Sequence, residues 1–384
     1  MARREHTQHN QIDKRKHASA SAGRKEKPTE AGRRNDHARA ERTPVAFMAS
    51  GVAARDWALP VAVTVETEAQ LAEVLKHDAV ALVYLDEACF TDFAALIRRV
   101  HAAGKKAGLR LRRIERDFDA NGRKAENSAE LLNGLWKAAC LPDVLLVRNL
   151  DEAMLLEDFF GAHPELKTRI RRNFDYTVYG YNQEAIQALV SLGADGLTYP
   201  IELTYHECRK LREKLQSSVR GAAGTHSTNV DDAAGTRGTN ADAVEGESTP
   251  VPAAARAGAD AEADSIGFGE LPFELMIYGH LPMMVSANCI QRTSARCDHG
   301  NRILQLRDRM GKDMPVRCYC TYCYNQIFNA EPLVLYDLPD EVRALQPQCL
   351  RYDFSVEPAA VVRQVLEGAV PRSMTRGHFR HGIE

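Results

Sequence analysis

The sequence predicts an α/β protein built as a TIM-like (β/α) barrel, complete or slightly irregular. From Trp57 onward, short β-branched or apolar runs alternate with helical segments, and seven such runs precede residue 288. Hydrophobic residues make up 44% of the 384 residues, which is enough for a sizeable core. An open doubly wound sheet is the alternative, less favoured because no glycine-rich phosphate loop follows the first strand.

Strands and helices are expected in alternating order along the barrel. The expected strands are Val61–Glu66, Ala81–Leu85, Lys106–Leu111, Val144–Arg148, Ile170–Val178, Gly196–Leu203 and Phe273–Ser286. The expected helices between them are Glu68–Lys76, Phe93–Ala103, Ser128–Lys137, Leu150–Phe160, Gln183–Leu192 and Tyr205–Leu215. Further strands are expected at Ile327–Asp337 and Cys349–Val356, followed by a helix over Pro358–Glu367 with proline in its first turn.

Residues 1–50 are expected to form a disordered basic tail. Residues 1–42 hold 12 Lys/Arg and 6 Asp/Glu, a charge of 12 − 6 = +6, so the remainder carries −2 − 6 = −8. The tail has no apolar periodicity from which to build a core. A basic arm of this kind either adds affinity for RNA through phosphate contacts or is a solvated extension without a partner, and charge alone leaves both open.

The barrel is expected to span residues 51–287, interrupted by a disordered insertion at 217–266. The inserted segment consists mainly of Ala, Gly, Thr, Ser, Asp and Pro without a periodic apolar face. A long flexible loop costs little extra closure entropy, so the barrel can accommodate it. Residues 288–384 are expected to form a cysteine-containing segment and a small C-terminal cap.

A cytoplasmic location without membrane contact is expected. No stretch of the chain approaches the length of an apolar membrane span, and charged residues stand where a signal peptide needs an apolar run. In a reducing compartment the nine cysteines are not expected to form a disulfide framework.

Five of the nine cysteines fall between Phe273 and Asn325. The best four-ligand set is Cys289, Cys297, Cys320 and Cys323, with one pair from the strand end and following loop and the other from a Cys-x-x-Cys turn. Four thiolates suit Zn²⁺ and an iron–sulfur cluster equally, and spacing does not decide between them.

The other cysteines are expected to play different parts. Cys318 competes for a ligand position because alternation on an extended segment puts it on the same face as Cys320. The remaining four lie in or beside apolar runs, where a cysteine acts as a small hydrophobe. They are Cys89, Cys140, Cys208 and Cys349.

Polar residues at the ends of the expected strands form a second group of candidates. They are Glu66, Arg112, Arg113, Arg148, Asn149, Asp175, Tyr176, Glu202, His280 and Ser286. In a (β/α) barrel these residues converge on the face that carries active sites. Asp175, Glu202 and His280 are the candidates for acid–base catalysis, and Arg112, Arg148 or Arg292 for binding an anionic substrate. For each of them a helix cap or a salt bridge at the barrel rim is the competing interpretation.

The cysteine-rich run resembles the signature of the collagenase-like peptidase family U32. The matching pieces, in order, are Leu275–Gly279, Leu281–Cys289, Asp308-Arg309, Met314–Val316, Cys320–Asn325 and Gly377–Arg380, with weaker matches at Asp175–Tyr179 and Tyr199–Leu203. The resemblance covers about residues 57–384. It implies a four-iron four-sulfur cluster on Cys289, Cys297, Cys320 and Cys323, and a role in hydroxylating bases of tRNA or ribosomal RNA or in oxygen-independent quinone hydroxylation.

The residues give little support to the peptidase activity in the family's name. Neither Gly-x-Ser-x-Gly nor His-Glu-x-x-His occurs, and a site whose ligands are all thiolates leaves no position open for catalysis. The sequence therefore predicts an iron–sulfur-dependent hydroxylase or hydroxylation factor that acts on RNA. A collagenase-like peptidase and a zinc-stapled, non-catalytic binding module are the alternatives.

Overall fold

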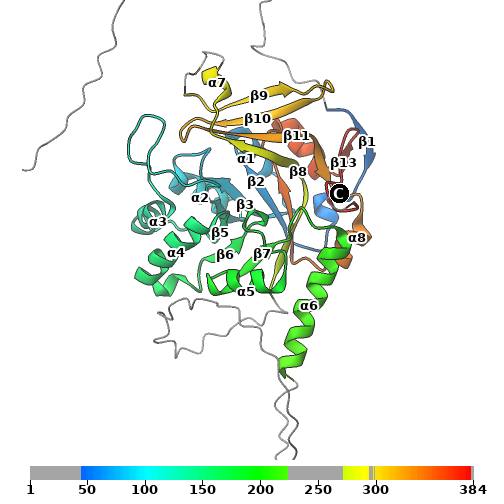
Figure 1. The fold of residues 1–384 in the computed structure, drawn as a ribbon, viewed down its shortest axis with the longest axis horizontal. Helices are drawn as coiled ribbons and strands as arrows, with labels where there is room; N and C mark the ends of the chain where they lie inside the picture. Colours follow the sequence, from blue (N-terminus) through cyan, green and yellow to red (C-terminus); the bar gives the residue numbers. More distant parts are fainter. Residues whose placement is uncertain (1–44, 224–270, 294–296, 298, 382–384) are drawn as a thin grey trace, which may run out of the picture. The chain divides into compact units, whose positions relative to one another are not determined.

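Eight parallel strands close into a barrel in the computed structural model, which describes residues 45–223, 271–293, 297 and 299–381 (Figure 1). The strands, in barrel order, are β2 (Val61–Val65), β3 (Val80–Asp86), β4 (Lys106–Arg110), β5 (Val144–Val147), β6 (Arg171–Phe174), β7 (Gly196–Thr198), β8 (Phe273–Ser286) and β12 (Cys349–Asp353). β12 pairs with both β8 and β2, which closes the ring. The TIM-like barrel is confirmed, and the open-sheet alternative is wrong.

The eighth barrel strand comes from the segment that was expected to form the C-terminal cap. β12 was expected as a strand, but its partners were expected to lie outside the barrel. Leu350 and Tyr352 are fully buried, because β12 fills the gap between β8 and β2. The domain boundary expected at residue 287 is therefore wrong, because the barrel includes a strand from the C-terminal segment.

Helices cover the outside of the barrel (Figure 1), and several of them begin at a polar cap. Thr67, Asp92, Asn127, Asn149 and Asn182 each accept a backbone N–H bond at a helix start, which satisfies a donor that the helix leaves unpaired. The helices are α1 (Glu68–Val74), α2 (Phe93–Ala102), α3 (Ser128–Lys137), α4 (Leu150–Ala162), α5 (Gln183–Ser191), α6 (Tyr205–Ala223), α8 (Pro339–Ala344) and α9 (Ala359–Leu366), with 3-10 turns at Ala54–Asp56, Pro164–Leu166 and Tyr176–Val178.

Two segments expected to be irregular contain regular structure. α6 continues through Ala223, beyond the expected start of the insertion at 217, because extending an existing helix is far easier than starting one. β1 (Phe47–Ser50), at the end of the expected tail, pairs with β13 (Ala369–Pro371). Residues 1–44 and 224–266, the rest of the two segments expected to be disordered, lie outside the described residues. No helix in the described ranges has both the length and the apolar character needed to cross a membrane.

The cysteine segment forms an antiparallel extension of one barrel strand. β8 continues beyond the barrel and pairs with β11 (Tyr324–Val334), which pairs with β10 (Asp313–Tyr319), and β10 pairs with β9 (Arg302–Arg307). A short helix, α7 (Ile290–Thr293), follows β8. Figure 1 shows β9, β10 and β11 beside one another at one end of the barrel.

Successive side chains of a barrel strand point alternately outward and inward, and the inward ones fill the barrel. Val61, Val63 and Val65 point outward and belong to the large apolar core shared with the helices. Ala62, Tyr84, Val144 and Leu146 form a separate apolar cluster. A Cβ at Gly108 would lie 2.4 Å from the Tyr84 ring, so the glycine makes room for this side chain.

Candidate active site at the mouth of the barrel

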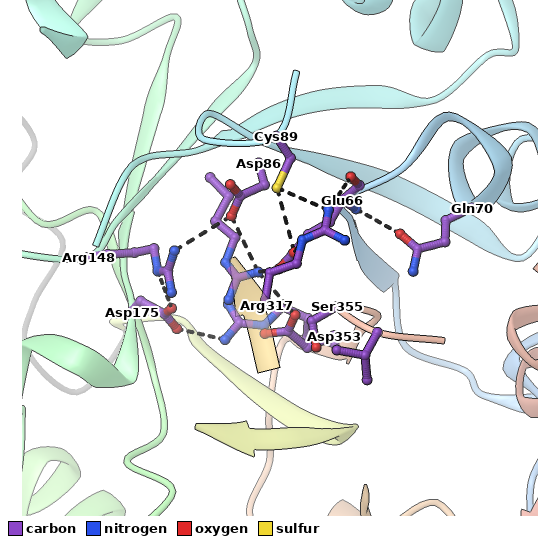
Figure 2. Close-up of polar contacts among 12 residues, drawn as sticks. Glu66, Gln70, Asp86, Cys89, Arg148, Asp175, Arg317, Asp353 and Ser355 are labelled. Carbon is purple, nitrogen blue, oxygen red and sulfur yellow. Dashed lines mark hydrogen bonds and ion pairs between the residues drawn. The ribbon is translucent and has the colours of Figure 1, made fainter. Parts of the chain in front are cut away.

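Nine buried charged side chains form one connected network at the C-terminal end of the barrel strands. Its members are the carboxylates Glu66, Asp86, Asp175, Glu274 and Asp353 and the arginines Arg110, Arg148, Arg317 and Arg351. Figure 2 shows the labelled members pointing toward one another. Five carboxylates thus face four guanidinium groups in a region shielded from water.

Arg351 holds one side of this network together. Its guanidinium lies 2.6 Å from Asp175 Oδ1 and 2.7 Å from Glu274 Oε1, and its side chain is fully buried. The pKa of Asp175 is lowered although burial opposes ionisation, because Arg351 and Arg148 stabilise the carboxylate. Asp175 is therefore a permanently charged partner of the arginines rather than a group that exchanges protons.

Glu66 lies at the other side, directly after β2. Its carboxylate contacts Arg110 at 3.2 Å, Arg317 at 3.0 Å and the Tyr319 hydroxyl at 3.2 Å. Burial raises the pKa of Glu66 to about 7, against the opposing effect of Arg317. Negative Asp86 and Asp353 raise it further. Glu66 is the member of the network best suited to change protonation near neutral pH.

A second group of buried carboxylates lies beside the network. The Ser128 hydroxyl is within 3.1 Å of Glu87, 3.4 Å of Glu115 and 3.2 Å of Glu152. Burial raises the pKa of Glu87 to about 7, although Arg112 lies 3.0 Å away and opposes the shift. The Arg112 guanidinium also lies over the Tyr322 ring, at 4.6 Å. This group connects the barrel rim to the loop that carries the Cys-x-x-Cys turn.

β10 has two faces with different chemistry, as alternation along a strand requires. Arg317 and Tyr319 point toward the mouth and contact Glu66. Cys318 and Cys320 point the other way, into a cluster with Val316 that is covered by Ile290, Leu304, Leu306 and Ile327. One strand therefore separates the charged mouth from the cysteines.

The five cysteines of the segment lie within one another's electrostatic field. Burial raises the pKa of the Cys320 thiol to about 12, and the neighbouring cysteines add to the shift, in the order Cys318, Cys289, Cys297 and Cys323. Cys318 and Cys320 are buried, Cys289 is half-buried, and Cys297 and Cys323 are exposed. Thiols that oppose one another's ionisation are the donor chemistry that a thiophilic cation favours, because its charge releases the protons.

The expected ligand set stays untested by this arrangement. Cys289, Cys297 and Cys323 lie near enough to Cys320 to affect its pKa, and Cys318 lies on the same face as Cys320, as alternation predicted. The chemistry of the donors thus fits a metal or cluster. In the described ranges, however, no three His, Cys, Asp or Glu side chains are placed closely enough to hold a metal ion. Which four thiols would act as ligands stays a prediction.

The remaining cysteines divide into two kinds. Cys140 and Cys208 are buried in the main core, and Cys349 packs against the apolar cluster inside the barrel, so the expected hydrophobic role holds for these three. Cys89 differs, because its Sγ lies 3.6 Å from Glu66 Oε2 and accepts a bond from Arg317 at 3.4 Å. No local pattern around Cys89 indicated these polar contacts, because its partners come from β2 and β10.

The three expected acid–base residues have no contact with one another. His280 lies beyond the barrel, where Nδ1 is 2.8 Å from the Asn329 carbonyl oxygen and Nε2 is 3.7 Å from Glu357. Glu202 is half-buried, and burial raises its pKa while His378 and Arg113 oppose the shift. Asp175 is held by arginines, and a role of any of the three in acid–base catalysis stays a prediction.

Several other strand-end residues do converge as the barrel geometry predicted. Glu66, Arg148 and Asp175 belong to the central network, and Asn149 caps α4 and donates to the Arg112 carbonyl oxygen. Tyr176 lies under the Arg351 guanidinium. Ser286 and Arg292 lie in the cysteine segment, where the Ser286 hydroxyl and the Cys289 sulfur accept bonds from neighbouring backbone N–H groups.

Most members of the network were not expected from the sequence, namely Asp86, Arg110, Glu274, Arg317, Arg351 and Asp353. Asp86 and Arg110 could have been found from the sequence, because each is a charged residue at the end of an apolar strand, where alternation points its side chain into the barrel. Arg351 and Asp353 were missed because their strand was assigned to the cap. Arg317 reaches the mouth only through the folding of the extension over Glu66.

Comparisons with known proteins do not assign a function to this chain. No family model and no curated protein matches the chain. Among solved structures, the C-terminal domain of a putative chitinase from Desulfitobacterium hafniense DCB-2 is 10% identical, with a TM-score of 0.33 over 80% of this chain and 99% of that chain. The Bacillus cereus spore cortex-lytic enzyme SleL is 7% identical, with a TM-score of 0.33 over 83% and 76%. We draw nothing about activity from likenesses of this size.

Proposed function

We propose that this chain is an iron–sulfur-dependent hydroxylase or hydroxylation factor that acts on a base of tRNA or ribosomal RNA. The observation that carries the proposal is that Cys318 and Cys320 lie on the side of β10 that faces away from the charged barrel mouth, with Cys289, Cys297 and Cys323 near enough to raise the pKa of Cys320. The resemblance of this segment to the U32 family supports the hydroxylation of RNA bases. All nine cysteines are free, which supports a reducing compartment and hence the cytoplasm.

In this proposal, Cys289, Cys297, Cys320 and Cys323 hold a four-iron four-sulfur cluster, which supplies electron-transfer or oxidative chemistry when bound. The chain's own residues shape the surroundings. Burial of Cys318 and Cys320 under Ile290 excludes water from one side of the thiols. Arg317 and Tyr319 place a cation and a hydroxyl between this region and Glu66. The mouth can therefore orient a polar substrate group and exchange a proton with it.

The metal content of anaerobically purified protein tests whether the cysteines hold an iron–sulfur cluster. Iron and acid-labile sulfide in equal amounts, with a broad visible absorption and a brown colour, are expected. Cys320→Ser should abolish both. Cys318→Ser is the matched control, since it changes the neighbouring thiol on the same face and should leave the iron content largely intact. Loss of iron in Cys318→Ser with retention in one of the four expected ligand variants would correct the ligand set.

Nucleoside analysis tests the second half. RNA from cells lacking the gene should lack one hydroxylated nucleoside, and wild-type protein should restore it while Cys323→Ala should not. Full restoration by Cys323→Ala protein that contains no iron would rule out the cluster mechanism. An unchanged set of nucleosides in the deletion strain would rule out RNA as the substrate.

Structural zinc is the second candidate for the cysteines. The all-thiolate donor set favours it as much as a cluster, and Zn²⁺ would fix the extension over the barrel without chemistry. Colourless protein with stoichiometric zinc would favour this alternative. The collagenase-like alternative predicts cleavage of gelatin that is lost on mutation of a residue at the mouth.

A further inference from the structure

We propose that Glu66 is the proton-exchanging group of the barrel mouth, and that the cavity over Cys89 is where water or a small proton-accepting group reaches it. Glu66 and its neighbours belong to the mouth rather than to the cysteine site, and none of them is an expected ligand. Proton exchange at Glu66 therefore does not depend on whether the cysteines bind metal.

The charge count of the network requires one proton. Glu66, Asp86, Asp175, Glu274 and Asp353 face the four arginines of the network, and all nine side chains are almost fully buried. An uncompensated charge in such a place costs several kcal/mol, so a carboxyl group takes up a proton instead. One added proton would therefore leave these nine side chains without net charge.

Contacts at the two ends of the network indicate which carboxylate holds this proton. Glu274 lies at one end, where burial raises its pKa but Arg351 at 2.7 Å, the Tyr84 hydroxyl at 3.1 Å and Arg171 all favour its charged form. Glu66 lies at the other end, where Asp86 and Asp353 approach the same Arg110 guanidinium and add negative charge beside it. These two carboxylates oppose the ionisation of Glu66, in agreement with its raised pKa.

All the elements packed against Glu66 contribute charged or titratable groups. Besides Asp86 from β3, Arg110 from β4 and Asp353 from β12, Arg317 and Tyr319 reach it from β10. The thiol of Cys89 adds a further contact. Because Cys89 belongs to the connecting loop after β3 rather than to a strand, it lies nearer the outside of the barrel.

A cavity of about 430 Å³ is lined in part by Cys89. Its wall comes from the loop after β3, the first turns of α2 and Glu68 of α1, with Phe90 and Leu96 as apolar members and Arg99 paired to Glu68 at the rim. Cys89 is half-buried, with its sulfur 3.6 Å from Glu66 Oε2 and 3.4 Å from an Arg317 nitrogen. A molecule in the cavity is therefore one side chain away from Glu66.

The proton transfer needs only the arriving base and no oxidant or reductant. Protonated Glu66 gives its proton to a base that arrives over Cys89, and the carboxylate that remains is stabilised by Arg110 and Arg317. The reverse step returns the proton. No bond to carbon or sulfur changes, so the step serves as general acid–base catalysis for whatever reaction the mouth performs.

Infrared spectroscopy tests the proton directly. Between about pH 5.5 and about pH 8.5, wild-type protein should lose a protonated-carboxyl signal with a midpoint near neutrality. Glu66→Gln should remove this component and leave those of the other carboxyl groups whose pKa values are raised, namely Glu87, Glu152, Glu202 and Glu274. A spectrum unchanged by Glu66→Gln would overturn the proposal.

Alkylation of Cys89 by iodoacetamide, followed peptide by peptide with mass spectrometry, tests the path from the cavity. Glu66→Gln should raise the rate at Cys89 about tenfold at pH 8, because the thiolate no longer faces a carboxylate. Glu68→Gln makes the same chemical change on the exposed cavity rim, and should alter the rate less than about twofold through screening. Equal effects of the two variants would refute the link between the cavity and Glu66.

The pH dependence of Cys89 alkylation in wild-type protein provides a second test, which does not require Glu66→Gln to fold. The alkylation rate at Cys89 should rise less steeply with pH above neutrality than below it, because ionised Glu66 holds the thiol protonated. A rate that rises evenly through neutral pH, as it does for an isolated thiol, would contradict a neutral-range titration of Glu66.

Discussion

At the scale of single residues, the mouth of the barrel shows how context changes the behaviour of like groups. Asp175 and Glu66 are both buried carboxylates that directly follow a barrel strand. Two arginines lower the pKa of Asp175, whereas burial and two negative neighbours raise that of Glu66 to about 7. The balance between nearby arginines and nearby carboxylates therefore decides whether a buried carboxylate in the mouth stays charged or exchanges a proton.

The raised pKa of Glu66 predicts how stability depends on pH. Between its ordinary value of 4.5 and about 7, the folded protein binds a proton at Glu66 that the unfolded chain has released. Its contribution to the unfolding free energy therefore falls as pH rises through this window, by about 3 kcal/mol at most. Urea unfolding of Glu66→Gln at pH 5 and pH 8 should show a shallower fall than wild type. Glu68→Gln should show the wild-type dependence.

Arg351 offers a second prediction at this scale. Arg351→Met leaves Asp175 and Glu274 as buried carboxylates without their closest cation, which should cost about 3–5 kcal/mol of unfolding free energy. Arg363→Met is the matched control, because Arg363 is exposed and lies 3.8 Å from Glu73, and it should cost less than about 1 kcal/mol. Thermal or urea unfolding measures both. A small cost in Arg351→Met would show that the two carboxylates become protonated easily.

At the scale of elements, β10 joins the extension to the barrel. It pairs with β9 and β11, while Arg317 and Tyr319 reach across to Glu66 at the end of β2. The loop after β10 adds a backbone bond from Ala120 to the Thr321 carbonyl oxygen. The extension is therefore held over the mouth by these polar contacts and by a small apolar cluster of Ala88, Tyr319 and Tyr324.

Removing Arg317 should loosen the extension more than the barrel. In Arg317→Met, hydrogen exchange should accelerate more in β9, β10 and β11 than in β2 to β6. The unfolding free energy should fall by about 2 kcal/mol. This is less than the usual cost of breaking a buried ion pair, because Glu66 can take up a proton. Arg307→Met on β9 removes an exposed pair with Asp313 and should change exchange only locally. Uniformly faster exchange in barrel and extension would show instead that they unfold as one unit.

At the scale of the whole molecule, the barrel closes although a long connection separates α6 from β8 in the sequence. Arg212 on α6 donates to the Leu271 carbonyl oxygen, which fixes the C-terminal end of the connection beside the middle of α6 before β8 begins. The cost of closing a loop grows slowly with its length. The length of this connection should therefore matter little to the stability of the barrel.

Deletion of residues 230–260 tests this point. The residues that remain can still span about 50 Å when extended, more than the part of α6 beyond Arg212 requires. We expect a melting temperature within about 3 °C of wild type, measured by circular dichroism, and an unchanged iron content if the cysteines bind a cluster. A large loss of stability would mean that the deleted segment packs on the barrel.

Local sequence patterns were sufficient to predict the fold class and the strands and helices of the barrel, but not β9 and β10 of the extension. Apolar runs are local properties, so β2 to β5 and α1 to α5 lie close to their expected ranges, whereas β6 and β7 end before their expected ends at Val178 and Leu203. The pairing of β12 with β2 and β8 joins segments far apart in the chain, and local pattern cannot specify such a partner. The same reason explains the site. Alternation put Cys318 and Cys320 on one face, but only the folded extension brought Arg317 to Glu66 and made an ordinary carboxylate a proton carrier.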